Sequence, residues 1–183
     1  MNIDGLSMGS AGVFFDAPRG RSVNYNIGPD AHAQLSIEIW FKETASTSSL
    51  GWIIGHDNGG YDRAINIHDH RFGGVAAPPG RTYSSTLGYP SLNQWYHVVA
   101  TYNQGQSSGN TVFMRQLGGA LQSQALPVTR NNGGGLTSFD VGGLTSYGNH
   151  HVHADIAVVR VFEKILTEAE VNELYDSRPA SLN

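Results

Sequence analysis

The sequence predicts an all-β protein made of two packed antiparallel sheets and one short C-terminal helix. Three observations support this prediction. Short strand-like segments recur along the chain, with Gly, Pro, Asn and Ser between them. Residues 156–162 are apolar on both faces except for Arg160, which is typical of a strand covered on both sides. Helix-start chemistry follows directly, because Thr167 and Glu170 have the spacing of a capping box.

The first half of the chain contains several expected strands. Residues 12–16 and 21–27 form an opening pair. In the next strand, Leu35, Ile37, Ile39 and Phe41 alternate with their neighbours, as in a sheet with one core face. Residues 51–56 and 61–68 flank a short run rich in Asn and Gly, which favours a tight hairpin.

The second half continues the pattern and ends in the helix. Residues 94–103 form another long strand, and residues 111–117 and 120–128 form a hairpin around Gly118-Gly119. Residues 136–142 precede the closing strand. Only residues 167–176 have helical spacing, with Val171, Leu174 and Tyr175 on one stripe.

Composition limits the class of protein. The 183 residues fit a single domain, 1–183, that buries a core without disulfides, so the absence of Cys says little about compartment. A net charge of −4 argues against a nucleic-acid partner. The N-terminus has no signal-peptide pattern, and no window reaches the length of a membrane span. We therefore expect either a cytoplasmic protein or a domain of a longer exported chain.

Two runs of the sequence are distinctive. The first is Asn93-Gln94-Trp95-Tyr96-His97-Val98-Val99-Ala100-Thr101-Tyr102, and the second runs from Asp155 through Phe162 to Leu166-Thr167. Together with the opening strands they resemble the laminin-G-like, concanavalin-A-like jelly-roll modules, over nearly the whole chain. The resemblance implies a jelly-roll sandwich that acts as a lectin-like carbohydrate-binding module at the cell surface or outside the cell.

Glucanases that share this jelly roll place two carboxylates on one strand, about 5 Å apart in retaining enzymes. Glu38 is the strand acid that lies near an aromatic residue, and its neighbours two and four positions on are Trp40 and Lys42. No second carboxylate shares its face, so we predict that the chain is not an enzyme. Because an unpaired buried charge is costly, we also predict that Glu38 pairs with Arg160.

Loop residues are the main candidates for ligand binding. The segment 56–63 offers hard oxygen ligands and glycines, which suits Ca²⁺, although a solvated hairpin turn explains the same residues. Segment 69–90 is long for a connection and rich in Gly, Pro and Tyr, as functional loops often are. The predicted glycan-binding residues are Asp57, Asn58, Tyr61, Asp62, Arg63, Asp69, His70, Arg71, Tyr83, Tyr89 and Asn149.

Metal binding has three candidate sources. The first is Asp57 and Asp62 in the loop just described. The second is implied by the resemblance, which places the first and last strands side by side and brings Asp16 close to Asp155, where some relatives hold a structural Ca²⁺. Ordinary hydrogen-bonded aspartates explain this pair equally well. The third is zinc at the His68–His70 and His150–His153 clusters, for which surface histidines are the alternative.

Three functions are consistent with these observations. The preferred one is a non-catalytic glycan-binding module, with calcium as an optional aid, that attaches a larger protein or cell to glycans. The second is a protein–protein adhesion or structural module of a surface assembly, because one fold hosts unrelated tasks. The third is a polysaccharide-degrading enzyme, for which the carboxylate pattern gives no support.

Overall fold

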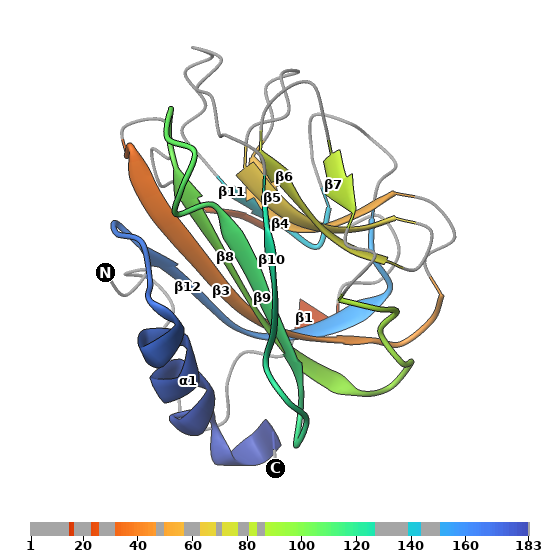
Figure 1. The fold of residues 1–183 in the computed structure, drawn as a ribbon. Coiled ribbons are helices and arrows are strands. Elements are labelled where there is room, and N and C mark those ends of the chain that lie inside the picture. Colours follow the sequence, from red (N-terminus) through yellow and green to blue (C-terminus); the bar gives the residue numbers. More distant parts are fainter. Residues whose placement is uncertain are drawn as a thin grey trace.

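The computed structural model describes residues 15–16, 23–25, 32–46, 50–56, 63–68, 71–76, 81–83, 87–126, 139–143 and 151–182. Within this part of the chain, two antiparallel six-stranded sheets lie one over the other (Figure 1). Sheet A has the order β1 (Phe15–Asp16), β12 (Ala154–Phe162), β3 (Gln34–Glu43), β8 (Trp95–Asn103), β9 (Thr111–Gln116), β10 (Gln122–Ala125). Sheet B has the order β2 (Val23–Tyr25), β11 (Phe139–Val141), β4 (Gly51–His56), β5 (Arg63–His68), β6 (Arg71–Ala76), β7 (Arg81–Tyr83).

The main core lies between the two sheets. The alternating set of β3 supplies Ile37 and Ile39, and these pack in one cluster with Ile65 and Ile67 of β5. A strand has a side-chain period of two, so the alternation seen in the sequence places this set on the inner face. The predicted all-β sandwich with a jelly-roll character is confirmed.

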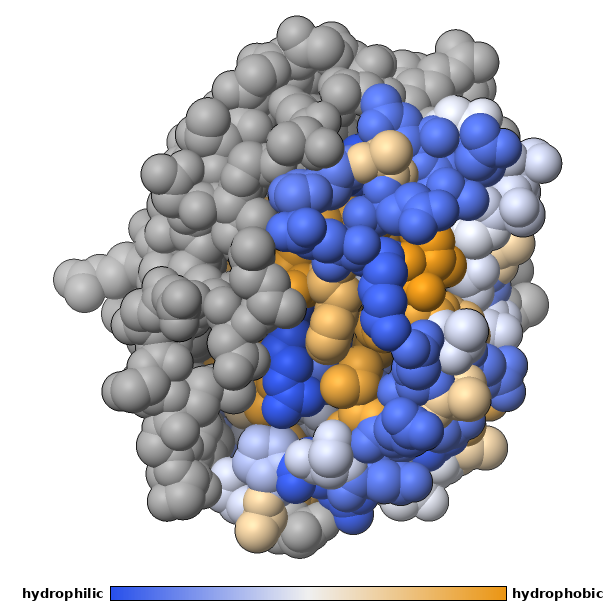
Figure 2. Space-filling view, turned by 90° about the vertical axis from the view of Figure 1, so that its left-hand side faces the viewer, coloured by the Kyte–Doolittle hydropathy of each residue, from blue (hydrophilic) through white to orange (hydrophobic). Residues whose placement is uncertain are grey.

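The outer face of sheet A is also covered, by helix α1 (Glu168–Asp176) and the short 3-10 helix η3 (Ala180–Leu182). Figure 1 shows α1 against the side of sheet A that is turned away from sheet B. Val171 packs with Val99 of β8, and Tyr175 and Leu182 pack with Trp40 of β3. Seen from the side of Figure 1 on which β12 and α1 lie, the described surface is mostly hydrophilic around a central apolar strip (Figure 2).

The helix begins as the sequence predicts. Thr167 is the N-cap, its hydroxyl accepts from the backbone N–H of Glu170, and the Glu170 carboxylate accepts from the N–H of Thr167 at 2.8 Å. This reciprocal pair satisfies two backbone donors that a helix leaves free.

A β-bulge in β12 decides which way Arg160 faces. The register shifts between Ala157 and Val159, and Val158 has a positive φ of 52°. The extra residue changes the alternation, so Val159 packs against the core while Arg160 is paired with Glu38 on the outer face. Without the bulge, regular alternation would turn the Arg160 position toward the core.

Two expectations about the strands are wrong. Strands β1 and β2 are not a pair, because β1 pairs with β12 in sheet A and β2 pairs with β11 in sheet B. The expected long loop at residues 69–90 contains strands β6 and β7. Glycine and proline in that segment suggested a loop, yet β6 pairs with β5 along all six of its residues.

Candidate functional site

Seven of the eleven predicted glycan-binding residues lie outside the described residues: Asp57, Asn58, Tyr61, Asp62, Asp69, His70 and Asn149. Arg71 and Tyr83 lie in β6 and β7, on positions that share one face of sheet B by register. The remaining predicted residues are Arg63, Tyr89, Asp155 and Asp16, and the structure gives each of these a definite place.

Arg63 lies inside the protein. Its side chain is buried, and its guanidinium donates to Oε1 of Gln104 at 3.3 Å. Nearby, the hydroxyl of Tyr102 donates to the carbonyl of Ala64 at 2.7 Å. Burial raises the pKa of Tyr102, and the Arg63 charge opposes this rise. Arg63 therefore helps to stabilise the packing between the sheets, and its contact with a ligand stays a prediction.

Asp16 and Asp155 are neighbours, as expected. They are register partners between β1 and β12, Asp155 pairs with Lys42, and Lys42 pairs with Trp95. We call these four positions the end row. The Lys42 ammonium lies 2.7 Å from the Asp155 carboxylate and 5.0 Å from the centroid of the Trp95 ring.

The Lys42 charge already neutralises Asp155, and the described residues contain no group of three or more metal-binding side chains. The predicted roles of Asp16 and Asp155 in calcium binding stay predictions.

The loop before β8 presents an exposed aromatic ring. Tyr89 is 58% exposed and Leu92 is 44% exposed, the two exposed large hydrophobic residues of the described chain. The loop is fixed by two hydrogen bonds, from the Asn93 N–H to the Glu43 carbonyl at 2.7 Å and from the Ser91 N–H to the Tyr96 hydroxyl at 2.8 Å. It leads directly into Trp95. We call the end row together with residues 87–94 the end surface.

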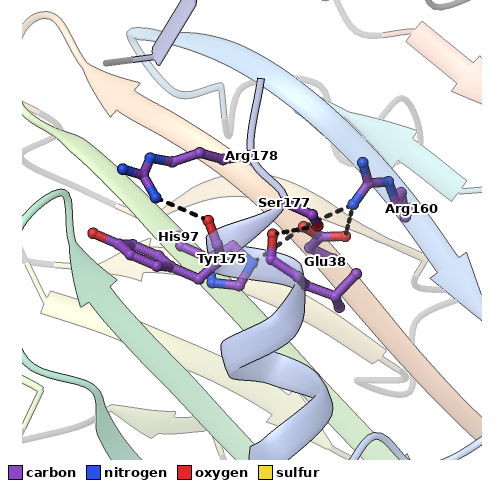
Figure 3. A network of polar contacts seen from close by, with 7 residues as sticks. Glu38, His97, Arg160, Tyr175, Ser177 and Arg178 are labelled. Atoms are coloured by element: carbon purple, nitrogen blue, oxygen red, sulfur yellow. Dashed lines mark hydrogen bonds and ion pairs between the residues drawn. The ribbon is translucent and has the colours of Figure 1, made fainter. Parts of the chain in front are cut away.

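A separate polar cluster lies beneath α1 (Figure 3). The Glu38 carboxylate is fully buried and lies 3.1 Å from Nη1 of Arg160 and 3.1 Å from Nε2 of His97. The predicted Glu38–Arg160 pair is therefore confirmed, and His97 is an additional partner. Arg160 is only partly buried, so its charge is still reached by water.

Tyr175 of α1 covers this cluster. Its ring stacks on Trp40 at 5.4 Å, and the guanidiniums of Arg115 and Arg178 lie 4.3 and 4.8 Å from its centroid. Its hydroxyl accepts the N–H of Gly118 at 2.7 Å. Such cation–π contacts and aromatic stacking hold the helix on the sheet. The enclosed arrangement explains how α1 docks.

Sheet B contains two buried polar side chains that the sequence analysis missed. Trp52 and Asn66 are register partners, 2% and 0% exposed. In the described part of the chain, Nε1 of Trp52 and both amide atoms of Asn66 have no hydrogen-bond partner. The available signal was alternation, because Asn66 stands between the core residues Ile65 and Ile67 and so belongs to the opposite face.

Comparisons with known proteins agree with this fold. The family model of the concanavalin A-like lectin/glucanases superfamily, of the laminin G type, matches residues 18–172. A comparison with curated proteins gave no match. No helix in the described residues is long and apolar enough to cross a membrane.

Several solved structures are similar at low sequence identity. Trypanosoma rangeli sialidase in complex with 2,3-difluorosialic acid has a TM-score of 0.67 and 15% identity, over 90% of this chain and 27% of the sialidase chain. The same sialidase in complex with sialic acid gives the same values. The binding domain of botulinum neurotoxin DC in complex with SialylT has a TM-score of 0.57 and 14% identity, over 85% of this chain and 39% of that chain.

These likenesses correct one prediction. We expected that the chain is not an enzyme, because no second carboxylate accompanies Glu38 on its strand. That exclusion is wrong, since sialidase chains share this fold across 90% of the present chain. The chain spans about a quarter of the sialidase length, and at 15% identity the likeness shows the fold alone. We therefore no longer exclude catalysis.

Proposed function

Because this chain belongs to the concanavalin A-like lectin/glucanases superfamily, we propose that it binds carbohydrate. The binding domain of botulinum neurotoxin DC is in complex with SialylT, which supports carbohydrate binding as a use of this fold. The chain spans 27% and 39% of the similar chains. We propose that it acts as a module that attaches a larger protein or cell to glycans, outside the cell or at its surface.

The exposed aromatic ring at the end surface carries the proposal. Tyr89 is solvent-accessible on a loop that is held in place by two hydrogen bonds, one to the backbone of Glu43 and one to the side-chain hydroxyl of Tyr96. A fixed aromatic ring offers an apolar face to the C–H groups of a pyranose and a polar hydroxyl at its edge. The half-buried Trp95 and the Lys42–Asp155 pair add donors and acceptors for sugar hydroxyls.

A glycan array with matched variants tests this function. Tyr89→Ala removes the exposed ring, and we expect its affinity for the best array ligand to fall about tenfold, the equivalent of about 1.4 kcal/mol. Leu92→Ala is the matched control, because it shortens a similarly exposed aliphatic side chain of the same loop. An array that stays silent for the wild type contradicts carbohydrate binding and favours a protein partner instead.

We also propose that calcium assists binding, through Asp57 and Asp62 or through Asp16 and Asp155. Carboxylate oxygens are the ligands that Ca²⁺ prefers. The array is repeated in EDTA and after Ca²⁺ is restored. A signal that falls in EDTA and returns with Ca²⁺ supports the proposal, whereas equal signals in both conditions refute it.

A further inference from the structure

The face of sheet B that is turned away from the core carries both apolar and polar side chains. Leu50, Trp52 and Ala64 form an apolar cluster there, separate from the main core. Asn66 of β5 is paired with Trp52 on one side and with Gly73 of β6 on the other. Gly73 contributes no side chain to this row, so the amide of Asn66 is the polar group between Trp52 and the next strand.

The buried amide of Asn66 lowers the stability of the folded state. Its oxygen and nitrogen are both shielded from water and unpaired within the described residues, and so is the indole nitrogen of Trp52. A buried polar group without a partner loses its hydration without compensation. Such groups are rare in folded proteins and require a specific explanation.

The unpaired atoms define the chemistry of a partner. The amide offers a donor and an acceptor side by side, and the indole offers one further donor. Neighbouring hydroxyl groups of a sugar match this set, because each hydroxyl both donates and accepts. A carboxylate or phosphate would match less well, since its ionised oxygens only accept hydrogen bonds and would leave the amide oxygen of Asn66 without a donor.

We infer that Trp52 and Asn66 form a subsite for the hydroxyl groups of one sugar residue, on sheet B and apart from the end surface. This inference rests on the proposed carbohydrate binding and gives the chain a second place of contact. Both side chains are covered in the structure, so the sugar enters by local opening of this face. Asn66 is thus kept for binding at the expense of stability.

The experiment combines melting temperatures with nuclear magnetic resonance. The side-chain N–H signals of Asn66 and Trp52 are assigned from Asn66→Leu and Trp52→Phe, since the chain has three tryptophans. D-galactose, D-glucose and N-acetylneuraminic acid are the probes. We expect at least one sugar to shift both signals while the signal of Trp40 stays unmoved.

Asn66→Leu separates a binding group from a structural one. We expect it to raise Tm by about 2–6 °C, because it removes unpaired polar atoms, and to abolish the sugar-induced shift of Trp52. Asn66→Ala is the second variant, expected to abolish the shift in the same way. Asn110→Leu is the matched control, since the Asn110 amide is fully engaged with Asn103 and Gln106, and its Tm should fall.

Three results would overturn the inference. The first is that no probe shifts the Trp52 signal in the wild type, and the second is that Asn66→Leu binds sugar as the wild type does. The third is that Asn66→Leu melts earlier than the wild type, as Asn110→Leu does.

The test also separates this subsite from the proposed function. Array binding that depends on Tyr89 without any Trp52 shift refutes only the subsite. A Trp52 shift that persists in Tyr89→Ala supports the subsite independently of the end surface.

Discussion

Glu38 shows how this protein accommodates a charge on a strand that is buried on both faces. Its carboxylate has no access to water, yet it lies within hydrogen-bond distance of both Arg160 and His97. A buried carboxylate that loses its cationic partner is strongly destabilising, whereas a paired one is tolerated. The contacts therefore assign Glu38 a structural role beneath α1.

Replacing Glu38 by Gln should lower stability without affecting glycan binding. The amide keeps the shape but leaves Arg160 without its charge partner, and we expect a loss of about 1–3 kcal/mol. Asp155→Asn is the matched control, because its pair with Lys42 is partly exposed and should cost about 0–1 kcal/mol. Chemical denaturation measures both. Equal losses for the two variants would contradict this account of the burial.

Part of the residue-level chemistry could be predicted from sequence. The Glu38–Arg160 pair was predictable because two opposite charges stood in the two most apolar strands. The Trp52–Asn66 pair was not, because recognising it requires the register between β4 and β5, which shifts between Trp52 and Ile54. The contact of His97 with Glu38 was likewise not predicted, because it depends on side chains from two strands, β8 and β3.

At the scale of the element, the charge of the Glu170 carboxylate stabilises the start of α1. The hydrogen bond from Lys164, followed by those from Thr167, lowers the pKa of Glu170 to about 2 from an ordinary 4.5. A depressed carboxylate pKa stabilises the fold fully above the unfolded value, and this contribution is lost as the pH falls through the folded value. The window for the capping box therefore runs from the ordinary value of 4.5 down to about 2.

Glu170→Gln should reveal this window. Gln keeps a side-chain acceptor but loses the charge, so the variant should melt below the wild type at about pH 7 and approach it as the pH falls from about 5 to about 2. Calorimetry at several pH values measures the difference in melting temperature between the variant and the wild type. Glu168→Gln is the control, because Glu168 is also in the first turn but closes no box. A gap that stays constant down to the lowest pH would refute the role of the charge.

The strands β4 and β5 approach closely at Gly55. A Cβ on Gly55 would clash with the Cβ of Ala64, and the two residues occupy directly paired positions. Gly55→Ala should therefore cost about 1–3 kcal/mol through overpacking. Adding Ala64→Gly should recover part of the loss, as thermal melting can show. A double variant less stable than both single variants would contradict the steric explanation.

Strands β6 and β7 show why element prediction failed in one region. Residues 71–83 contain several small residues and prolines, which favour loops when judged locally. The pairing of β6 with β5 over six positions is a non-local feature that overrides this preference. The hydrophobic alternation of β3 and the capping box of α1 are local signals, and both predicted the observed structure.

At the scale of the whole molecule, sheet A is the structural centre. It contacts sheet B through the main core and α1 through two smaller clusters, so the most apolar strands are covered on both faces. The double coverage explains why β3 and β12 carried the clearest sequence signals. It also means that α1 is part of the folded unit.

Removing the helix should therefore destabilise the whole fold. A chain ending at Leu166 loses the fully buried Val171 and the buried Tyr175 and Leu182, each worth about 1.5–3 kcal/mol, and exposes Trp40. A domain is stable by only about 5–15 kcal/mol, so we expect this chain to be largely unfolded or aggregated at about 25 °C. Circular dichroism and size-exclusion chromatography measure this.

A chain ending at Ser177 is the graded control for the helix deletion. It keeps Val171 and Tyr175 on sheet A and loses the packing of Leu182 and the contact of Arg178 with Tyr175, so it should remain folded with a Tm lowered by several degrees. If the chain ending at Leu166 folds as well as the one ending at Ser177, the helix is a dispensable attachment. In that case the outer face of sheet A must be stable in water, against the burial of its aromatic and aliphatic side chains.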